Sequence, residues 1–338
     1  MRYLVALAVA FGVSALLTWL LASRPPLRRL LLQDPTDDRW HGVTTPSSGG
    51  VAMFSAFAAT LAAFGELGAA ELKVLGAGTV MFAVGLVDDI RPLGPGVKLA
   101  GQLLASIVLV ALGVHAGLDG GPLVYFPLSV AWVVLVTNGV NLIDGMDGLA
   151  AGVSALALIS ILARTVRFDG PASTVLIATL LGAVLGFLVF NVNPARIFMG
   201  DSGALWLGMT LAAITLLDRP GDGSNFLTVA MPVMLLAVPL FDTALVVVNR
   251  VRHRRPISQG GRDHSSNRLV ALGLDDRGAV AILWGIGATC GVIAYLGGLL
   301  EPAPWTAVAA PAWAGLAVFG VLLSKVDVYG DRPLEPGA

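Results

Sequence analysis

The residues of this chain best suited to chemistry are five aspartates at the edges of long apolar runs. Asp88 and Asp89 end one run, and Asp201 follows a glycine at the start of another. Asp144 and Asp147 are three residues apart, so on a helix they would share a face. Ionised carboxylates that lie close together near lipid repel one another and lose hydration. A bound cation relieves both costs, and oxygen-only ligands favour a hard ion such as Mg²⁺.

Further polar residues lie beside these aspartates or inside an apolar run. Asn138 and Asn141 are three residues apart and precede Asp144. They either hold a nucleotide base or sugar, or cross-link neighbouring helices. Asp242 lies inside an apolar run that ends at Arg250, and we predict that Pro232 and Pro239 bend this run. An acidic residue at membrane depth indicates a functional site by default, and the alternative is a structural partner for an Arg or Asn.

Basic residues supply the opposite charge. Lys98 lies ten residues after Asp88, and the stretch from Arg250 to Arg268 holds six arginines and two histidines. Fixed carboxylates, a divalent ion and surrounding basic groups suit phosphoryl transfer, in which positioning and charge neutralisation do most of the catalysis. The plainer alternatives are that single aspartates cap helices and that basic loops orient helices and contact anionic lipid. The five aspartates together favour the chemical interpretation.

The composition shows what kind of chain must position these residues. Of the 338 residues, 56% are apolar and 13% are charged, about half the ~25% usual in soluble domains. This excludes an ordinary soluble enzyme, a disordered chain and a disulfide-built secreted domain. The net charge of −1 gives no indication of nucleic acid as a partner. Cys290 is the single cysteine, so the chain has no internal disulfide.

The apolar runs predict the fold class. A spanning helix needs ~20 mostly apolar residues, and only helices or closed barrels satisfy their backbone in lipid. The runs do not alternate between polar and apolar residues, so we predict an all-α polytopic membrane protein with about eleven transmembrane helices. Their approximate positions are 3–23, 49–65, 74–87, 99–114, 123–143, 148–163, 172–190, 203–217, 226–249, 278–300 and 304–324.

The distribution of basic residues predicts the orientation. With eleven spans, sixteen of the 21 Lys and Arg residues fall on one side of the membrane and five on the other. The positive-inside rule makes the richer side cytoplasmic, which places the N-terminus outside and the C-terminus inside. We therefore predict one transmembrane domain over 1–325, with a cytoplasmic substrate loop over 250–277. A short, mobile cytoplasmic tail follows over 326–338.

The polar residues form a layer at the cytoplasmic face. A transport path needs polar groups at mid-membrane that are reached from both sides, and only Asp242 hints at one. We therefore predict an enzyme that works at the cytoplasmic interface of the plasma membrane. An ion-coupled transporter and a structural scaffold are the remote alternatives.

Four motifs then indicate a family. They are Val87-Asp88-Asp89 with Lys98 and Gln102, the run from Asn141 to Gly148, Ile197-Phe198-Met199-Gly200-Asp201-Ser202-Gly203, and Pro239-Leu240-Phe241-Asp242-Thr243. In these motifs, and from about Asp34 to Leu274, the chain resembles the polyprenyl-phosphate N-acetylhexosamine-1-phosphate transferases, which are of the glycosyltransferase family 4 type. The resemblance implies transfer of a sugar-1-phosphate from a UDP-sugar to polyprenyl phosphate, with release of UMP. It favours the GlcNAc-1-phosphate branch, and the phospho-N-acetylmuramoyl-pentapeptide transferase of peptidoglycan synthesis is the nearest rival.

The resemblance also implies roles for individual residues. Asp88, Asp89 and Asp201 are the expected catalytic residues. Mg²⁺, for which Mn²⁺ may substitute, is expected on Asp201 and Asp144. The expected substrate-binding residues are Lys98, Asn138, Asn141, Asp147, Arg196, Arg262 and His264. The expected partners are the UDP-sugar, the polyprenyl phosphate and membrane lipid, with a homodimer left open.

Two departures from the family pattern leave the sugar open. The family commonly carries a His-x-His-His run in the arginine-rich loop. Aligned on Arg268, only His264 remains here, because Ser266 and Asn267 occupy the other positions. The entry motif at 34–41 is one residue shorter than usual and lacks a lysine. We expect both segments to contact substrate rather than metal, so the chemistry survives these changes.

Overall fold

The computed structural model describes residues 1–24, 32–33, 45–64, 68–168, 173–218, 224–258 and 260–329, and these are mostly helical. A short antiparallel pair joins β1 (Leu32–Gln33) to β2 (Thr45–Pro46). The helices are α1 (Arg2–Ser23), α3 (Gly49–Phe64), α4 (Ala69–Ile90), α5 (Pro95–Ala111), α6 (Pro122–Leu142), α7 (Leu149–Phe168), α8 (Thr174–Asn191), α9 (Gly200–Leu217), α10 (Asn225–Leu235), α11 (Ala237–Arg252), α12 (Ser265–Ala271), α13 (Asp276–Leu296) and α14 (Pro302–Ser324).

The prediction of a multi-pass helical membrane protein is confirmed. Among the described helices, eight are long and apolar enough to cross a membrane, or up to nine if one bent pair counts as a single span. Helices α3 and α5 are apolar but shorter. Each predicted run overlaps a helix or the bent pair, while the count of eleven and the orientation stay predictions.

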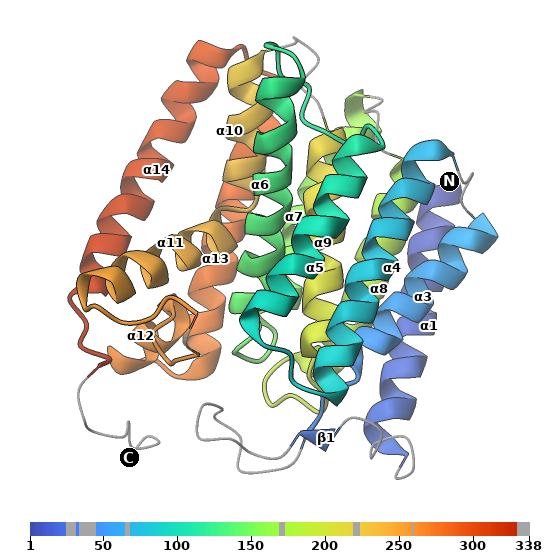
Figure 1. Cartoon of the computed structure of the whole chain (residues 1–338), viewed down its shortest axis with the longest axis horizontal. Coiled ribbons are helices and arrows are strands. Elements are labelled where there is room, and N and C mark those ends of the chain that lie inside the picture. The colour runs from blue at the N-terminus through green and yellow to red at the C-terminus, as the bar shows by residue number, and fades with distance from the viewer. Residues whose placement is uncertain are drawn as a thin grey trace.

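The predicted span over 226–249 is bent, as its two prolines predict, but it is broken into two separate helices rather than one bent helix. Helices α10 and α11 are bent by 80° relative to each other, and Leu236 separates them. Pro232 and Pro239 flank the break, and neither has an amide hydrogen to donate to a helical ladder. In Figure 1, α11 runs crosswise to α10 instead of continuing along it. Asp242 therefore lies on a crosswise helix rather than inside an upright span.

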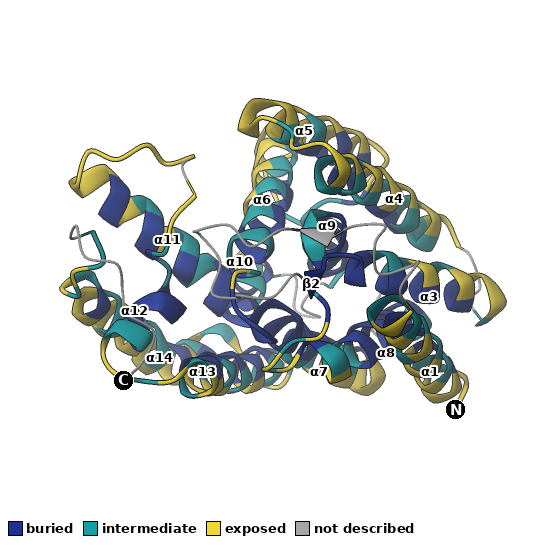
Figure 2. Cartoon of the chain, turned by 90° about the horizontal axis from the view of Figure 1, so that it is seen from below, coloured by how far each residue is buried: buried dark blue, intermediate teal, exposed yellow. Residues whose placement is uncertain are grey.

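Helix α9 is the centre of the bundle. Its residues from Ser202 to Leu216 are buried, and α3, α4 and α6 all pack against it (Figure 2). Glycines allow the close approach: a Cβ on Gly208 would lie 2.7 Å from Thr137 Cα on α6, and one on Gly203 would lie 2.8 Å from Gly50 Cα on α3. The outer helices expose large apolar side chains, such as Leu104 and Val318, as expected where lipid covers the surface.

The polar residues gather at one end of this bundle. Helix α4 ends there and α9 begins there, while α5 begins and α6 ends close by, at the lower end in Figure 1. The crosswise α11 and the short α12 lie toward the same end. The fold thus brings together residues that are far apart in the sequence.

Candidate active site

Asp89 fastens the end of α4 to the start of α9. Its Oδ1 accepts a hydrogen bond from the Asp201 amide at 2.8 Å, and its Oδ2 accepts one from the Ser202 amide at 3.0 Å. The first amides of a helix lack partners within it, and a negative charge there is favourable. Gly200 precedes them with φ of 73°, and a Cβ on it would lie 2.8 Å from Asp89 Oδ2. Asp89 therefore caps α9 and fixes the position of Asp201.

Lys98 joins two carboxylates from different helices. Its Nζ lies 2.7 Å from Asp88 Oδ2 and 2.5 Å from Asp201 Oδ2. The other Asp88 oxygen accepts a hydrogen bond from the Leu93 amide at 2.6 Å, which closes the turn between α4 and α5. The side chains of Lys98 and Asp201 are 25% and 24% exposed, so this cluster can be reached from solvent.

A polar cavity of about 220 Å³ opens beside Asp201. Asp144 and Asp147 contribute to its lining from the segment after α6, together with Asn141 at the end of that helix. Asn141 Nδ2 also donates to Asp201 Oδ1 at 3.2 Å. The cavity therefore combines three carboxylates and two side-chain amides, those of Asn141 and Asn191, within one small volume.

Asp147 holds the loop between α8 and α9 against the cavity. Its Oδ2 accepts hydrogen bonds from Asn193 Nδ2 at 3.2 Å and from the Ala195 amide at 2.9 Å. Arg277 at the start of α13 donates to Asn193 Oδ1 at 3.1 Å, which links this loop to the α12–α13 side of the bundle. Arg196 follows on the same loop and is exposed.

The structure thus brings together Asp88, Asp89, Lys98 and Asp201, with Asn141, Asp144 and Asp147 on the adjoining cavity. Asn138 lies elsewhere: its side chain forms a reciprocal amide pair with Gln102, at 2.6 and 3.2 Å, and does not line the cavity. The entry motif at 34–41 lies outside the described residues. The catalytic and substrate-binding roles stay predictions.

The donor set of the cavity suits a hard cation. Within the described part of the chain, no three His, Cys, Asp or Glu side chains are grouped closely enough to hold a metal. Mg²⁺ usually takes only one or two protein carboxylates and completes its shell with water and substrate phosphates. Asp201 and Asp144, which line one cavity with oxygen donors, fit such a site.

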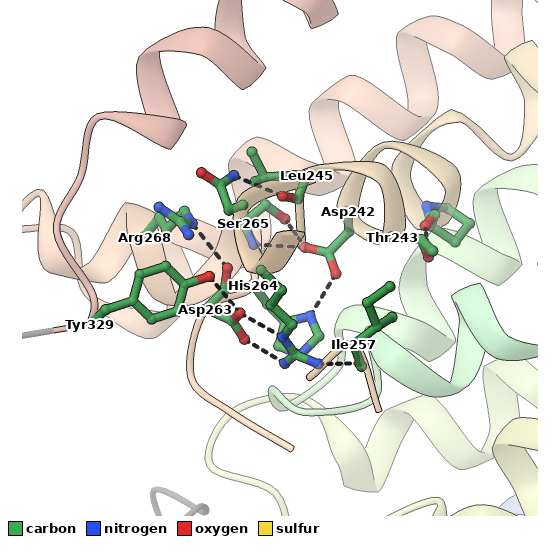
Figure 3. A network of polar contacts seen from close by, with 12 residues as sticks. Asp242, Thr243, Leu245, Ile257, Asp263, His264, Ser265, Arg268 and Tyr329 are labelled. Atoms are coloured by element: carbon green, nitrogen blue, oxygen red, sulfur yellow. Dashed lines mark hydrogen bonds and ion pairs between the residues drawn. The ribbon is translucent and has the colours of Figure 1, made fainter. Parts of the chain in front are cut away.

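A second polar network surrounds Asp242 (Figure 3). His264 Nδ1 lies 2.7 Å from Asp242 Oδ2, while the amide and hydroxyl of Ser265 each donate to Oδ1 at 2.6 Å. Asp242 is 1% exposed. Its carboxylate therefore caps α12 and orients the His264 ring, so Asp242 acts as a positioning residue.

Asp263 is the centre of the adjoining contacts. Arg250 reaches both carboxylate oxygens, with Nε to Oδ2 at 2.8 Å and Nη2 to Oδ1 at 2.6 Å. The Tyr329 hydroxyl donates to Oδ2 at 2.8 Å, and Arg268 Nε donates to the Asp263 carbonyl at 2.9 Å. No sequence pattern pointed to Tyr329, because it lies in a tail distant from every motif. In the described part of the predicted tail, residues 326–329, the Val326 carbonyl and the Tyr329 hydroxyl are hydrogen-bonded to the loop.

The pKa values of this network follow from its charges. Burial alone would lower the pKa of His264, but the Asp242 carboxylate raises it above its usual value. Burial would raise the pKa of Asp263, but the hydrogen bonds from Arg250 and Tyr329 hold it below its usual value. Burial and the bond to Asp263 raise the pKa of Tyr329. A cationic His264 and an anionic Asp263 are thus favoured side by side.

The substituted family histidines have a structural explanation. Ser266 and Asn267 lie in the first turn of α12 and are 4% and 7% exposed. Side chains buried there face packed protein, whereas the His264 side chain keeps 14% of its surface exposed. His264 is therefore the member of the reduced motif best placed to meet a ligand.

Comparison with known proteins places this site in a family. The model of glycosyl transferase family 4 matches residues 72–218. A probable undecaprenyl-phosphate N-acetylglucosaminyl 1-phosphate transferase of Bacillus subtilis is 32% identical over 84% of this chain and 83% of its own. The decaprenyl-phosphate N-acetylglucosaminephosphotransferase of Mycobacterium tuberculosis is 30% identical, over 89% and 84%.

The rival branch is also represented. A phospho-N-acetylmuramoyl-pentapeptide-transferase of Heliobacterium modesticaldum is 32% identical over 68% of this chain and 81% of its own. The two N-acetylglucosamine relatives match a larger share of the chain. On this similarity, the chain belongs to glycosyl transferase family 4.

Proposed function

We propose that this protein transfers GlcNAc-1-phosphate from UDP-GlcNAc to a polyprenyl phosphate and releases UMP, as the first membrane step of a cell-envelope glycan. The relatives named for this reaction support the substrates. One observation carries the proposal: Lys98 bridges Asp88 and Asp201 beside a cavity of carboxylates. Such an alternation of fixed charges is suited to holding two phosphate groups in contact.

The two substrates are assigned to the two sides of Lys98. The nucleotide sugar lies on the side of the cavity, where Asn141 and Asp147 face its uridine end, with Arg196, Arg262 and His264 near its phosphates and sugar. The acceptor phosphate lies on the side of Asp88. Asn138 supports this arrangement through Gln102 and does not itself contact the nucleotide.

The reaction needs little proton transfer. An oxygen of the acceptor phosphate attacks the phosphorus that carries the sugar, and the bond from that phosphorus to UMP breaks. A phosphate monoester has a second pKa of ~6, so at neutral pH the attacking group is already mostly dianionic. Asp88 therefore acts by holding Lys98 in place for the acceptor phosphate, not as a general base.

Asp201 and Asp144 would hold Mg²⁺, or Mn²⁺ in its place. When bound there, the metal would supply positive charge to the pyrophosphate as UMP leaves. Lys98, whose Nζ lies 2.5 Å from Asp201 Oδ2, adds a positive charge of the protein itself beside this site. Asp89 keeps Asp201 at the mouth of the cavity by capping α9.

The orientation is part of the proposal. The cluster faces the cytoplasm and the N-terminus lies outside, in agreement with the excess of basic residues on the side of the arginine-rich loop. The membrane is the plasma membrane, where both substrates meet. Cysteine labelling of sealed cells at two exposed positions, Glu301 before α14 and Ser258 in the arginine-rich loop, tests this: only the second position should be protected from an impermeant reagent.

The substrate is tested with purified enzyme and polyprenyl phosphate. UMP release is measured in parallel with UDP-GlcNAc, UDP-GalNAc and UDP-N-acetylmuramoyl-pentapeptide. We expect UDP-GlcNAc to be used with a kcat/KM at least an order of magnitude above the other two. Preferential use of the pentapeptide donor would assign the chain to the rival branch, and no UMP from any donor would refute the proposal.

A further inference from the structure

The chain continues past α14 and packs onto the arginine-rich loop. Tyr329 lies in this tail, with its hydroxyl on Asp263 Oδ2 at 2.8 Å (Figure 3). Its ring is also occupied: the Arg255 guanidinium lies 4.4 Å from the ring centroid, and that of Arg268 lies 5.6 Å from it. Guanidinium groups over an aromatic ring are attracted to it electrostatically. Both the hydroxyl and the ring of Tyr329 therefore have defined contacts with the loop.

The tail leading to Tyr329 is held as well. Arg268 Nη1 donates to the carbonyls of Leu323 at 3.0 Å and Val326 at 2.9 Å, at the end of α14 and just beyond it. Arg268 is 1% exposed. The same side chain donates through Nε to the Asp263 carbonyl. One buried arginine therefore joins the tail to the loop that Tyr329 contacts.

Asp263 connects the docked tail to the two residues beside it in the loop. It lies between Arg262 and His264, the two loop residues assigned to the donor. Its Oδ2 takes hydrogen bonds from both Tyr329 and Arg250, while its carbonyl is held by Arg268. The backbone of the segment that presents Arg262 and His264 is thus fixed at the residue between them.

We propose that Tyr329 is a positioning residue for the donor site, which acts through Asp263 on Arg262 and His264. The inference rests on the proposed function for the donor, but the contact it describes is independent of it. Loss of the hydroxyl leaves Asp263 Oδ2 with Arg250 alone, so the segment from 262 to 264 gains freedom. Ordering that segment must then be done by the nucleotide sugar, which weakens donor binding.

The test compares full-length Tyr329→Phe with wild type and with Tyr295→Phe. Tyr295 is also half-buried, but it lies near the opposite end of α13, beside Phe168. We expect Tyr329→Phe to raise the KM for UDP-GlcNAc about five- to tenfold, with the KM for polyprenyl phosphate and kcat within twofold of wild type. Tyr295→Phe should leave all three unchanged. An unchanged donor KM in Tyr329→Phe, or an equal rise for both substrates, overturns the proposal.

A second measurement keeps this result separate from that of the proposed function. Backbone amides of 260–268 should exchange hydrogen faster in Tyr329→Phe than in wild type, with no substrate present, while those of α9 are unaffected. Unchanged exchange overturns the positioning role even if no donor is turned over. If the wild-type protein fails to use UDP-GlcNAc but exchange rises as expected, the proposed function fails and the tail contact stands.

A double-mutant cycle tests the route through Asp263. In an Asp263→Ala background, Tyr329→Phe should have no additional effect on exchange or donor KM, because the acceptor of its hydroxyl is gone. Additive effects would show that Tyr329 acts by another route and would overturn the assignment.

Discussion

Asp89 caps the helix on which Asp201 lies, through hydrogen bonds to the Asp201 and Ser202 amides at 2.8 and 3.0 Å. Two aspartates that look alike in the sequence therefore have different tasks. Both carboxylate oxygens of Asp89 accept hydrogen bonds from backbone amides of α9. Asp201 instead lines the cavity and contacts Lys98. The position of Asp201 therefore depends on Asp89.

This difference predicts different phenotypes for the same substitution. Asp89→Asn places an amide group against a backbone N–H, so it should lose activity and also about 1–2 kcal/mol of stability, as for a lost helix cap. Asp201→Asn should lose activity while unfolding near the wild-type temperature. UMP release and thermal unfolding in detergent measure both, and an Asp89→Asn protein of wild-type stability would contradict the capping role.

Lys98 is expected to be needed for transfer and not replaceable by arginine. Lys98→Met leaves Asp88 and Asp201 without the cation between them, so kcat/KM should fall on the order of a hundredfold or more. Lys98→Arg keeps the charge but spreads it over a planar fork that does not match a single point between two carboxylates. It should recover only a small part of the activity. Full activity of Lys98→Met in the UMP assay would refute the assignment.

The His264–Asp242 pair predicts a pH dependence of stability. The pKa of His264 is raised in the folded protein, so the pair contributes fully below the unfolded value of about 6.5. Its contribution is lost as the pH rises through the folded pKa. Asp263 favours the same cation, and Arg250 opposes it. The difference in unfolding temperature between wild type and His264→Gln should be largest near pH 5.5 and shrink toward pH 9. A difference that grows with pH would contradict this.

The contacts also favour direct displacement over an enzyme-bound intermediate. The carboxylates of Asp88 and Asp201 are both paired with Lys98, and that of Asp89 accepts two amide hydrogens. Such pairing stabilises a carboxylate and makes it a poor nucleophile. Labelled UMP should therefore not exchange into UDP-GlcNAc in the absence of polyprenyl phosphate. Rapid exchange would show that an aspartate carries the phosphosugar.

The sequence was sufficient for the helices and for the polar cluster. Charge-free runs mark helices because lipid allows no unpaired backbone, and aspartates at the ends of such runs meet when those ends share a face. Pro232 and Pro239 predicted a bend in the run 226–249, but hydropathy does not report the direction of the backbone, so the 80° break at Leu236 was not predicted. Asn138 is hydrogen-bonded to Gln102 and does not line the cavity. Its direction depends on how α6 is rotated about its own axis, which the spacing of residues does not reveal.

Tertiary contacts decide the remainder. Asp89 and Asp201 have the same side chain, so composition alone does not separate the cap from the cavity residue. Tyr329 is a single aromatic residue in a polar tail, and only the path of α14 brings it to Asp263. Such contacts depend on the packing of elements that are far apart in the sequence, and no local pattern encodes them.

Donor binding should depend on a divalent cation, because Asp201 and Asp144 would hold one that supplies positive charge to the pyrophosphate of the donor. The most direct measurement is calorimetric titration of UDP-GlcNAc into the purified protein, with Mg²⁺ and with EDTA, for wild type and Asp201→Asn. We predict binding to wild type at least tenfold tighter with Mg²⁺ than with EDTA, and no such difference for Asp201→Asn. UMP release should stop in EDTA and return with Mg²⁺ or Mn²⁺. Equal donor affinity in Mg²⁺ and EDTA, with activity retained in EDTA, would contradict the claim.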